Sequence, residues 1–420
     1  MADLLTSIDE HELVLRFGAT RRLTDQLAAV LSAEDQTVQS MPDVSPTKWH
    51  RAHTSWFFET FLLQPWLAGY EIFHPDFGYL FNSYYVGVGE RYPRYDRGLV
   101  SRPGIIEVGD YRRHVDAHMG VLLAAGLEPG AAFLVDLGIQ HEQQHQELLL
   151  MDIKHVLSRN PMLPVYLPLT LPASEPTTPV TWTSHGGGTV EIGHGGHGFG
   201  FDNEFPRHRV HLEPFALADR PVSSGEWLEF IDDGGYRRPE LWLSDGWATV
   251  EAEGWDAPLY WSHRDDGWRE FTLAGEVAVD PSRPVCHVSY YEADAFARWA
   301  GQRLPTEAEW EVVSTARSDG APTGHLLDTL VLHPSATAGS AAAPFGDVWQ
   351  WTSSAYSPYP GFSPESGAVG EYNGKFMVNQ YVLRGGSCVT PADHIRATYR
   401  NFFPPAARWA FSGLRLARNA

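Results

Sequence analysis

The segment from Leu137 to Glu147 reads LGIQHEQQHQE and places two histidines, His141 and His145, four residues apart. A run rich in Leu follows, and neither Gly nor Pro occurs between Ile139 and Asn160. Such a composition predicts a helix. In a helix, positions i and i+4 lie on one face, one turn apart. The chain is therefore expected to contain a long helix that presents two imidazoles, a potential pair of metal ligands, to one neighbour.

Two other interpretations of this pair remain open at the level of sequence. The chain has 19 histidines, so a surface pair at this spacing can arise by chance. The letters also satisfy H-E-x-x-H, the zinc-protease signature, in which Glu142 would be the general base. The longer zincin pattern is absent, because no G-x-x-H follows. A third ligand from elsewhere in the chain is needed to decide.

Length and charge limit the classes of partner. A chain of 420 residues with 43% hydrophobic residues can form two or three domains with a substantial core. Its net charge of −21 argues against nucleic acid or an anionic membrane as a partner and suits a soluble cytoplasmic protein. The segment Met1 to Glu12 lacks the apolar region of a signal peptide, and no window of about 18 apolar residues predicts a spanning helix.

Cysteine usage excludes two further classes of protein. The chain contains only Cys286 and Cys388, too few for a disulfide framework or a Cys-rich zinc site. Either a single disulfide or two buried thiols is compatible with this number.

Four helices are expected in the first half of the chain. One begins near Ser45-Pro46, with Ser45 as N-cap and Pro46 at the first helical position, and it carries His50 and His53. The other three are predicted from apolar spacing at residues 8–36, 106–126 and 131–157. We therefore predict a four-helix bundle in which His53 and the later histidine pair lie on different helices, an arrangement that often builds metal sites.

A long irregular segment, residues 65–103, separates the second and third predicted helices. It is rich in Tyr, Gly and Pro, and a loop of this length inside a compact domain is usually functional. Four arginines within 12 positions of an acidic protein indicate carboxylate recognition; they are Arg91, Arg94, Arg97 and Arg102. The alternative is a solvated loop whose arginines pair with surface acids.

The character of the chain changes after residue 160. We predict a helical domain at 1–160, a proline-rich linker at 161–179 and an irregular α+β domain at 180–420, which makes the fold class α+β. In the last domain the pattern predicts strands at 189–192 and 209–212 and helices at 224–232 and 289–299. No internal repeat is present.

Several motifs, taken together and in order, resemble one known family. The first half contains WHRAHT at 49–54 and HEQQH at 141–145. The second half contains GFDNE at 200–204, GQRLPTEAEWE at 301–311, GDVWQWT at 346–352 and LRGGS at 383–387. The combination resembles the hercynine oxygenases, the sulfoxide synthases of ergothioneine biosynthesis. The resemblance spans nearly the whole chain and implies a DinB-like iron-binding bundle followed by a formylglycine-generating-enzyme-like domain of C-type-lectin-related fold. The added histidine bundle and the lack of a redox Cys pair set the chain apart from the formylglycine-generating enzymes themselves.

The resemblance implies a non-haem Fe(II) centre that uses O2 as co-substrate. His53, His141 and His145 match the family's three ligands; His50 is the rival to His53, and the family pattern favours the histidine before Thr54. Three imidazoles leave coordination positions open for O2 and the sulfur donor. Two residues match substrate-binding positions, Gln144 for the hercynine imidazole and Asn401 in YRNFF; ordinary helix polarity and loop capping are the alternatives.

The sulfur donor implied by the resemblance is free cysteine. Arg94 and Arg97 resemble the Arg-x-x-Arg that holds the donor's carboxylate. The family branch that uses γ-glutamylcysteine has an Asp where this chain has Phe403, and it takes its catalytic Tyr from the second domain. Tyr84 and Tyr85 resemble instead the loop of the cysteine-using branch. A phenol there could supply a proton or an electron and steer the reaction from thiol dioxygenation to sulfoxide synthesis.

Departures from the family pattern leave alternatives open. Asp347 and Gln350 stand where GNVWEW is expected to have Asn and Glu, which weakens any inference of bound calcium. The rival functions are a selenoneine synthase that joins a seleno-sugar to hercynine, a DinB-type metal-dependent thiol transferase and a non-catalytic lectin-like module. The expected partners are small molecules, namely hercynine, cysteine and O2, while the oligomeric state is not predicted.

Overall fold

The computed structural model describes residues 10–317, 322, 324–335 and 343–420. Its contacts divide the chain into two compact units. Unit 1 comprises Met1–Met162, Gly196–Phe199 and Pro364–Tyr372, and unit 2 comprises Leu163–Gly195, Gly200–Ser363 and Asn373–Ala420. Two short segments that follow residue 195 therefore belong to unit 1.

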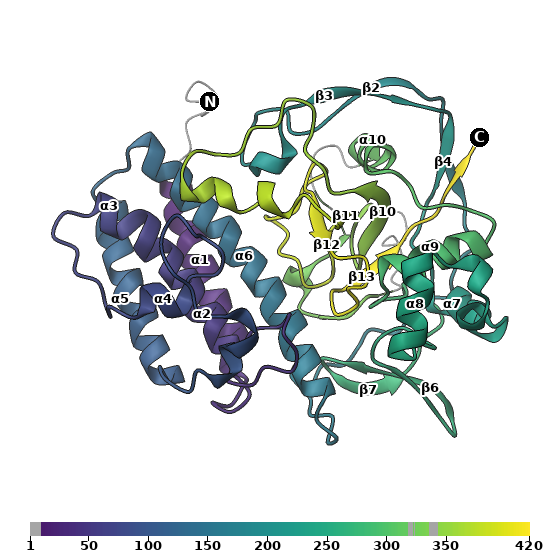
Figure 1. Ribbon diagram of the computed structural model, residues 1–420, viewed down its shortest axis with the longest axis horizontal. Coiled ribbons are helices and arrows are strands. Elements are labelled where there is room, and N and C mark those ends of the chain that lie inside the picture. The colour runs from purple at the N-terminus through teal and green to yellow at the C-terminus, as the bar shows by residue number, and fades with distance from the viewer. Residues whose placement is uncertain (1–9, 318–321, 323, 336–342) are drawn as a thin grey trace. The chain divides into compact units, whose positions relative to one another are not determined.

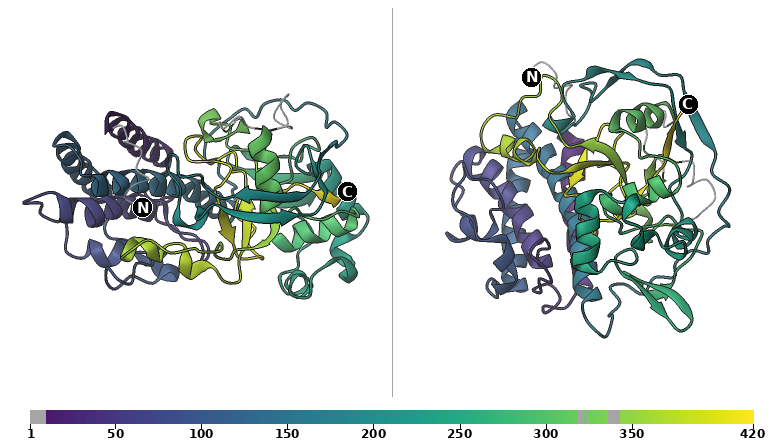
Figure 2. Two further views of the ribbon diagram at one scale, coloured as in Figure 1. Left: turned by 90° about the horizontal axis from the view of Figure 1, so that it is seen from above. Right: turned by 45° about the vertical axis from the view of Figure 1, so that its right-hand side comes forward.

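Four long helices form the framework of unit 1 within its described residues, as predicted. They are α1 (Glu10–Ala29), α2 (Thr47–Phe58), α5 (Ile105–Ala124) and α6 (Pro129–Ser158). Figures 1 and 2 show these helices lying side by side, and α2 packs against both α5 and α6 while α1 packs against α6. Residues on α2 and α6, the two helices that carry the predicted ligands, are thereby brought into direct contact.

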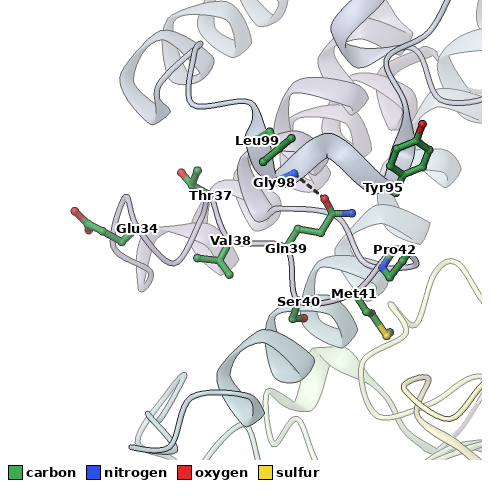
Figure 3. A pocket seen from close by; sticks show the side chains of 10 residues that line it. All are labelled: Glu34, Thr37, Val38, Gln39, Ser40, Met41, Pro42, Tyr95, Gly98 and Leu99. Atoms are coloured by element: carbon green, nitrogen blue, oxygen red, sulfur yellow. Dashed lines mark hydrogen bonds between the residues drawn. The ribbon is translucent and has the colours of Figure 1, made fainter.

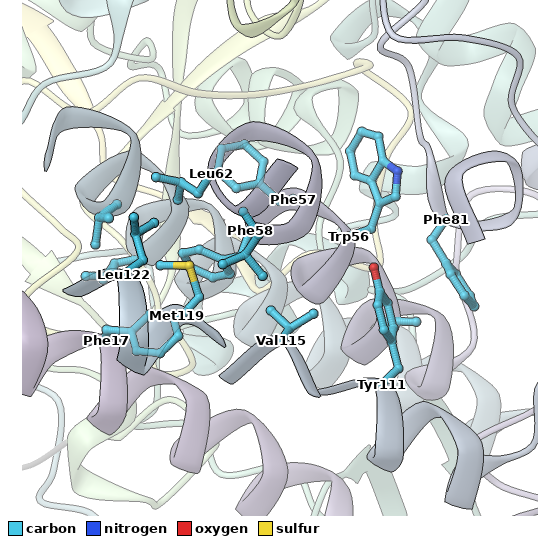
Figure 4. Close-up of a cluster of buried hydrophobic side chains, with 14 of the residues drawn as sticks. Phe17, Trp56, Phe57, Phe58, Leu62, Phe81, Tyr111, Val115, Met119 and Leu122 are labelled. Atoms are coloured by element: carbon cyan, nitrogen blue, oxygen red, sulfur yellow. The ribbon is translucent and has the colours of Figure 1, made fainter. Parts of the chain in front are cut away.

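Aromatic side chains fill the space between these helices. Figure 4 shows Phe57 and Phe58 of α2 beside Met119 and Leu122 of α5, and all four are buried. Gly138 of α6 is needed for this close approach, since a Cβ there would lie 2.5 Å from the Phe58 ring. A glycine inside a helix lowers its intrinsic stability, and here it allows α6 to lie close to α2 beside the histidine pair.

The end of α1 and the start of α2 differ from prediction. Helix α1 ends at Ala29 rather than at residue 36, because the Ser32 and Asp35 side chains exchange hydrogen bonds with each other's backbone N–H (3.0 and 3.1 Å) and form a turn. Residues 8 and 9 of the predicted helix lie outside the described residues. The expected Ser45 cap is also wrong: Pro46 is the N-cap of α2 and makes no side-chain cap bond, while the Ser45 hydroxyl accepts a hydrogen bond from Arg97.

The segment 65–103 contains more regular structure than predicted. Helix α2 continues through a π-helical turn (Glu59–Leu63) into α3 (Gln64–Trp66), which reaches the start of this segment. Helix α4 (Phe77–Phe81) and a 3₁₀ helix (Arg94–Leu99) lie within it. Helices this short are unstable alone. Aromatic packing supports α4, because the Phe77 ring meets Tyr111 of α5 at 5.0 Å.

Unit 2 is built around a four-stranded sheet in the order β12-β11-β10-β13. The strands are β10 (Trp349–Ala355), β11 (Tyr381–Arg384), β12 (Asn401–Phe403) and β13 (Ser412–Leu414), and helices α9 (Tyr290–Trp299) and α10 (Glu307–Arg317) contact this sheet. The predicted strands are confirmed as the antiparallel pair β2 (Gly188–Ile192) and β3 (His208–Leu212). The predicted helices are confirmed as α7 (Ser224–Asp232) and α9.

Smaller sheets and helices complete unit 2. A three-stranded sheet contains β1 (Trp182–His185), β4 (Phe215–Ala218) and β14 (Ala417–Asn419), and another contains β5 (Trp261–Arg264), β6 (Gly267–Thr272) and β7 (Gly275–Ala278). A short parallel pair joins β8 (Gly324–His325) to β9 (Phe345–Gly346), and α8 (Ser244–Glu253) precedes β5. The proline-rich segment is tied to this unit, because Arg283 donates hydrogen bonds to Ser174 Oγ and to the Pro172 carbonyl.

The two positions that depart from the expected GNVWEW motif are both engaged inside unit 2. The Asp347 carboxylate contacts His325 Nδ1 at 2.9 Å and accepts the Ser335 N–H at 2.8 Å. The Gln350 amide oxygen accepts from Trp310 Nε1 at 2.7 Å. Both cysteines are buried and neither forms a disulfide. Among the described residues, no helix is long and apolar enough to cross a membrane.

Candidate metal centre

The structure brings three of the predicted site residues together inside unit 1. His53 comes from α2, His141 and His145 come from α6, and one ring nitrogen of each lies within 4.8 Å of the other two. The Nε2 atoms of His53 and His141 are 3.2 Å apart. Two imidazole nitrogens held by one ion at about 2.1 Å would be about 3.0–3.4 Å apart in octahedral or tetrahedral geometry. Within the described part of the chain, this is the only group of three or more His, Cys, Asp or Glu residues arranged to hold a metal ion.

The three rings are neutral at physiological pH. Burial lowers the pKa of His141 to about 4. The pKa values of His53 and His145 lie well below 6.5, first because burial penalises the charged ring and second because His141 is adjacent. A metal ion needs the unprotonated imidazole nitrogen. The cluster therefore already has the protonation state that coordination requires.

The His53 ring is held in one orientation. Its Nδ1 donates to the backbone carbonyl of Phe81 at 2.6 Å, so in the neutral ring the lone pair is on Nε2. Trp49 and Trp56 lie on either side of it in sequence, and each stacks with the His53 ring at an interplanar angle of 14°. The Nε2 atom of His53 is thus directed at His141.

His50, the rival ligand, lies outside this group of three. Its Nδ1 is 2.8 Å from His145 Nδ1 and its Nε2 is 3.0 Å from Asp152 Oδ2. Both ring nitrogens of His50 are thereby engaged by other side chains. The geometry favours His53 as the ligand from α2.

The glutamate of the HEQQH segment points away from the histidines. Glu142 is fully buried, and its carboxylate accepts hydrogen bonds from Arg21 of α1 at 2.8 Å and from Arg112 of α5 at 3.0 Å. Burial alone would raise the pKa of Glu142, but the two guanidinium groups outweigh burial and lower it to about 2. A zinc-protease mechanism needs this carboxylate as a general base. Glu142 has no such freedom, so that interpretation of the motif fails.

The two predicted donor-binding arginines differ in their surroundings. Arg97 is buried, lies 3.4 Å above the Trp49 ring and donates to the hydroxyls of Ser45 and Ser83 at 2.9 and 3.3 Å. It forms no ion pair with any residue in the described part of the chain, and burial together with Arg94 lowers its pKa well below the usual value. Arg94 is exposed, and its guanidinium donates to the Asp43 carbonyl. Arg97 is therefore buried, whereas the Arg94 side chain lies at the protein surface.

A surface pocket next to the 3₁₀ helix is separate from this cluster. Its volume is about 600 Å³, and Figure 3 shows Tyr95, Gly98 and Leu99 on its wall, with the Gly98 N–H donating to Gln39 at 2.7 Å. The remaining lining residues are Glu34, Thr37, Val38, Ser40, Met41 and Pro42. None of the predicted site residues lines it.

The predicted tyrosine pair lies in a loop of unit 1. Tyr85 is buried, and its ring contacts Trp56 and Phe61 at centroid distances of 5.6 and 5.3 Å. Tyr84 is half-buried and stacks on Tyr372 at 5.3 Å. Burial raises the pKa of both phenols, and their side chains hydrogen-bond to each other. Both are therefore neutral at pH 7.

Sequence reasoning missed the segment Pro364–Tyr372, which belongs to unit 1 and meets the tyrosine loop. The Glu371 carboxylate accepts the backbone N–H groups of Val86 and Gly87 at 3.0 and 2.7 Å. These residues are separated from Glu371 by 285 and 284 positions. No local pattern in the sequence could have predicted a contact across that distance.

The other two predicted substrate-binding residues, Gln144 and Asn401, lie on α6 and β12. Gln144 is half-buried on α6, between Gln143 and His145. Asn401 begins β12 in unit 2, where its side-chain oxygen accepts the Phe402 N–H at 2.9 Å. Phe403, at the other end of β12, meets Trp409 edge-on at 5.4 Å.

A Sulfatase-modifying factor enzyme 1-like domain matches residues 171–325 and 342–420. The hercynine oxygenase of Mycolicibacterium smegmatis is 37% identical over 317 residues, 69% of this chain and 72% of the relative. That of Mycobacterium tuberculosis is 36% identical over 318 residues, 70% and 73% of the two chains. Ergothioneine biosynthesis protein 1 of Schizosaccharomyces pombe is 29% identical over 233 residues, 53% of this chain and 28% of that protein.

The fold and the site thus define an enzyme that combines a buried histidine cluster with a Sulfatase-modifying factor enzyme 1-like domain. The chain belongs to the hercynine oxygenase family of ergothioneine biosynthesis, as the sequence motifs predicted. It is an oxygenase, and the alternative of a non-catalytic lectin-like module is wrong.

Proposed function

We propose that the protein is a non-haem Fe(II), O2-dependent sulfoxide synthase. It would join the sulfur of free cysteine to the imidazole carbon of hercynine and release hercynylcysteine sulfoxide. The single observation that supports this most is the buried group of three neutral imidazoles, His53, His141 and His145, in a chain similar to hercynine oxygenases.

The donor set fits an Fe(II) ion. Imidazole nitrogens suit first-row transition metals, and three of them leave positions open for exogenous ligands. The Nε2 atom of His53 is free to coordinate because its Nδ1 is committed to Phe81. Bound Fe(II) would supply the redox chemistry that allows O2 to react with the thiol and the imidazole. The role of this chain is to hold the ligands neutral and fixed.

Arg97 is the group that we assign to the carboxylate of cysteine. It is a buried cation without an ion-pair partner among the described residues. Asp152 and Tyr84 are near enough to favour its charge electrostatically. A carboxylate ligand would offset its charge through a charge-assisted hydrogen bond. Arg94 would contribute only after its guanidinium leaves the Asp43 carbonyl.

Tyr84 is the phenol that we assign to proton donation. Tyr85 is enclosed by Trp56 and Phe61, whereas Tyr84 is half-buried and lies within electrostatic range of Arg97. Its O–H remains protonated at pH 7, and proton donation would require that the hydrogen bond between the Tyr84 and Tyr85 side chains be exchanged. Such a proton would favour C–S bond formation over oxidation of the thiol to a sulfinic acid.

Gln144 of unit 1 and Asn401 of unit 2 are separate candidates for hercynine binding, each because it matches a family position. The Gln144 amide would hydrogen-bond the substrate imidazole. The trimethylammonium group of hercynine would need aromatic faces, which attract quaternary cations.

Two alternatives differ from this proposal in the substrates that they consume. A selenoneine synthase uses a seleno-sugar without a carboxylate, which would leave Arg97 with no ligand; a DinB-type thiol transferase would not consume O2. The test is to load the full chain with Fe(II) and to supply hercynine with cysteine, γ-glutamylcysteine or a seleno-sugar at one O2 concentration. We expect O2 uptake and a sulfoxide product, with kcat/KM highest for cysteine. A preference for γ-glutamylcysteine above about tenfold, or turnover with the seleno-sugar alone, would overturn the donor assignment.

A further inference from the structure

A chain of three side chains leads away from the proposed metal centre inside unit 1. His145 Nδ1 lies 2.8 Å from His50 Nδ1, and His50 Nε2 lies 3.0 Å from Asp152 Oδ2. The same carboxylate oxygen accepts the Ser45 backbone N–H at 2.7 Å. His145, His50 and Asp152 are 8%, 2% and 3% exposed, so water does not compete for these bonds.

The direction of each hydrogen bond follows from the chemistry of the groups. Asp152 Oδ2 already accepts the Ser45 N–H, so it acts as an acceptor toward His50 as well, which places the His50 proton on Nε2. A neutral His50 then has a lone pair on Nδ1, and the short contact to His145 requires that His145 Nδ1 be the donor. The His145 Nε2 atom then carries no hydrogen and has a lone pair.

We propose that His50 and Asp152 are positioning residues that fix the tautomer of His145, so that its Nε2 is offered to the metal ion. This inference rests on the proposed metal centre and is independent of the sulfur donor. His53 achieves the same result with a backbone carbonyl. His145 has a side-chain relay instead, and that relay can be altered by substitution.

A second arrangement of protons would satisfy the same distances. If His50 carried protons on both nitrogens, it would donate to His145 Nδ1, and the His145 proton would move to Nε2, the wrong atom for coordination. The two arrangements therefore make opposite statements about which nitrogen of His145 carries hydrogen.

The experiment begins with metal-free protein labelled with ¹⁵N in histidine. Two-bond ¹H–¹⁵N spectra report the tautomer of each ring, and the His145 signals are identified from a His145→Gln variant. We expect His145 to be protonated at Nδ1. Hydrogen on Nε2 of His145 in the unmodified protein would overturn the proposal without any further variant.

Metal affinity provides the second readout, measured with Co(II) alone through its visible absorption bands. His50→Leu removes the acceptor and should weaken Co(II) binding by about 10- to 100-fold, the usual effect of losing such a partner. His50→Asn can place its side-chain oxygen near the former Nδ1 position, so it should restore the His145 tautomer and most of the affinity. His118→Leu, a half-buried histidine of α5 outside the cluster, is the matched control.

The outcomes separate this proposal from the proposed function. Equal Co(II) affinity in the unmodified, His50→Leu and His50→Asn proteins would contradict the relay even though the metal centre exists. Equal loss in both His50 variants, with unchanged thermal unfolding, would also contradict it, because the restored acceptor would then have no effect. If the unmodified protein binds neither Co(II) nor Fe(II), the proposed metal centre itself is wrong.

Discussion

Helix α6 contributes to two buried polar clusters that differ in how completely their charges are paired. The ion cluster consists of Glu142 with Arg21 and Arg112 from α1 and α5, and every charge in it has an opposite partner. The histidine cluster consists of His53, His141 and His145, all of them neutral. One sequence segment, HEQQH, supplies residues to both clusters.

The difference indicates which cluster is structural and which is functional. A buried charge that has all its hydrogen bonds is stable but has no capacity left for a ligand. The histidine cluster has unused lone pairs, and the buried guanidinium of Arg97, which lies within electrostatic range of His53 and His145, has no carboxylate partner in the described structure. Groups with perturbed pKa values and unused bonding capacity are typical of functional sites.

The largest expected effect comes from removing a ligand. His53→Ala or His141→Ala should abolish metal binding and all C–S coupling, because two imidazoles no longer complete the site. The free energy of unfolding should also fall by about 2–4 kcal/mol, because truncation of a buried ring leaves a cavity. Metal content and product formation are the measurements. Full iron loading in His53→Ala, with complete loss in His50→Ala, would show that His50 is the ligand from α2.

The opposite result is expected for the ion cluster. Glu142→Gln removes the buried carboxylate that Arg21 and Arg112 share and leaves them only the more exposed Asp116 and Asp25. It should lower the free energy of unfolding by about 3 kcal/mol. Because Glu142 faces away from the histidines, the folded fraction should keep its metal and its coupling activity. Urea titration and metal analysis of the same sample test both statements. Lost activity with unchanged stability would instead indicate that Glu142 is catalytic.

Sequence analysis predicted the elements that depend on local pattern. Helix α6 and the second-half helix predicted at 289–299, which is α9, follow from the residue pattern and are both present. The contacts that complete the site join residues that are far apart in the sequence. The Ser45 hydroxyl was predicted as a helix cap but is taken by Arg97, 52 residues away, and the loop that carries Tyr84 is held by Glu371. Such pairings depend on tertiary packing, which no window of sequence contains.

The next effect concerns which product forms. Tyr84→Phe removes the phenol proton and should shift the ratio of sulfoxide to cysteine sulfinate by about 100-fold toward sulfinate, within the usual range for loss of a general acid. Tyr85→Phe should mainly loosen packing against Trp56 and Phe61. O2 consumption and both sulfur products are measured for each variant. If neither variant changes the ratio of sulfoxide to sulfinate, another residue is the proton donor. Tyr372, which stacks on Tyr84, then becomes the candidate.

A smaller effect is expected on binding of the donor. Arg97→Met keeps the apolar contact with Trp49 but removes the charge, so KM for cysteine should rise at least tenfold while the metal content is unchanged. Loss of a charged hydrogen bond of about 1.5–3 kcal/mol gives this magnitude. Arg94→Met is the matched variant, and its exposed side chain predicts a smaller rise. A larger rise in Arg94→Met than in Arg97→Met would reverse the roles of the two arginines.

The smallest predicted effect tests the support of the tyrosine loop. The Glu371 carboxylate accepts two backbone N–H groups immediately after Tyr85, whereas a Gln side chain has only one acceptor oxygen. Glu371→Gln should therefore leave one N–H unpaired, cost about 1 kcal/mol and shift the sulfoxide-to-sulfinate ratio a few-fold toward sulfinate without changing metal content.

Glu90→Gln, at an exposed position in the same loop, is the control and should leave the ratio unchanged. If both variants give the ratio of the unmodified protein, the position of Tyr84 does not depend on the Glu371 contact. The loop must then be fixed by the stacking of Tyr84 on Tyr372. A Tyr372→Leu variant should in that case produce the shift that Glu371→Gln does not.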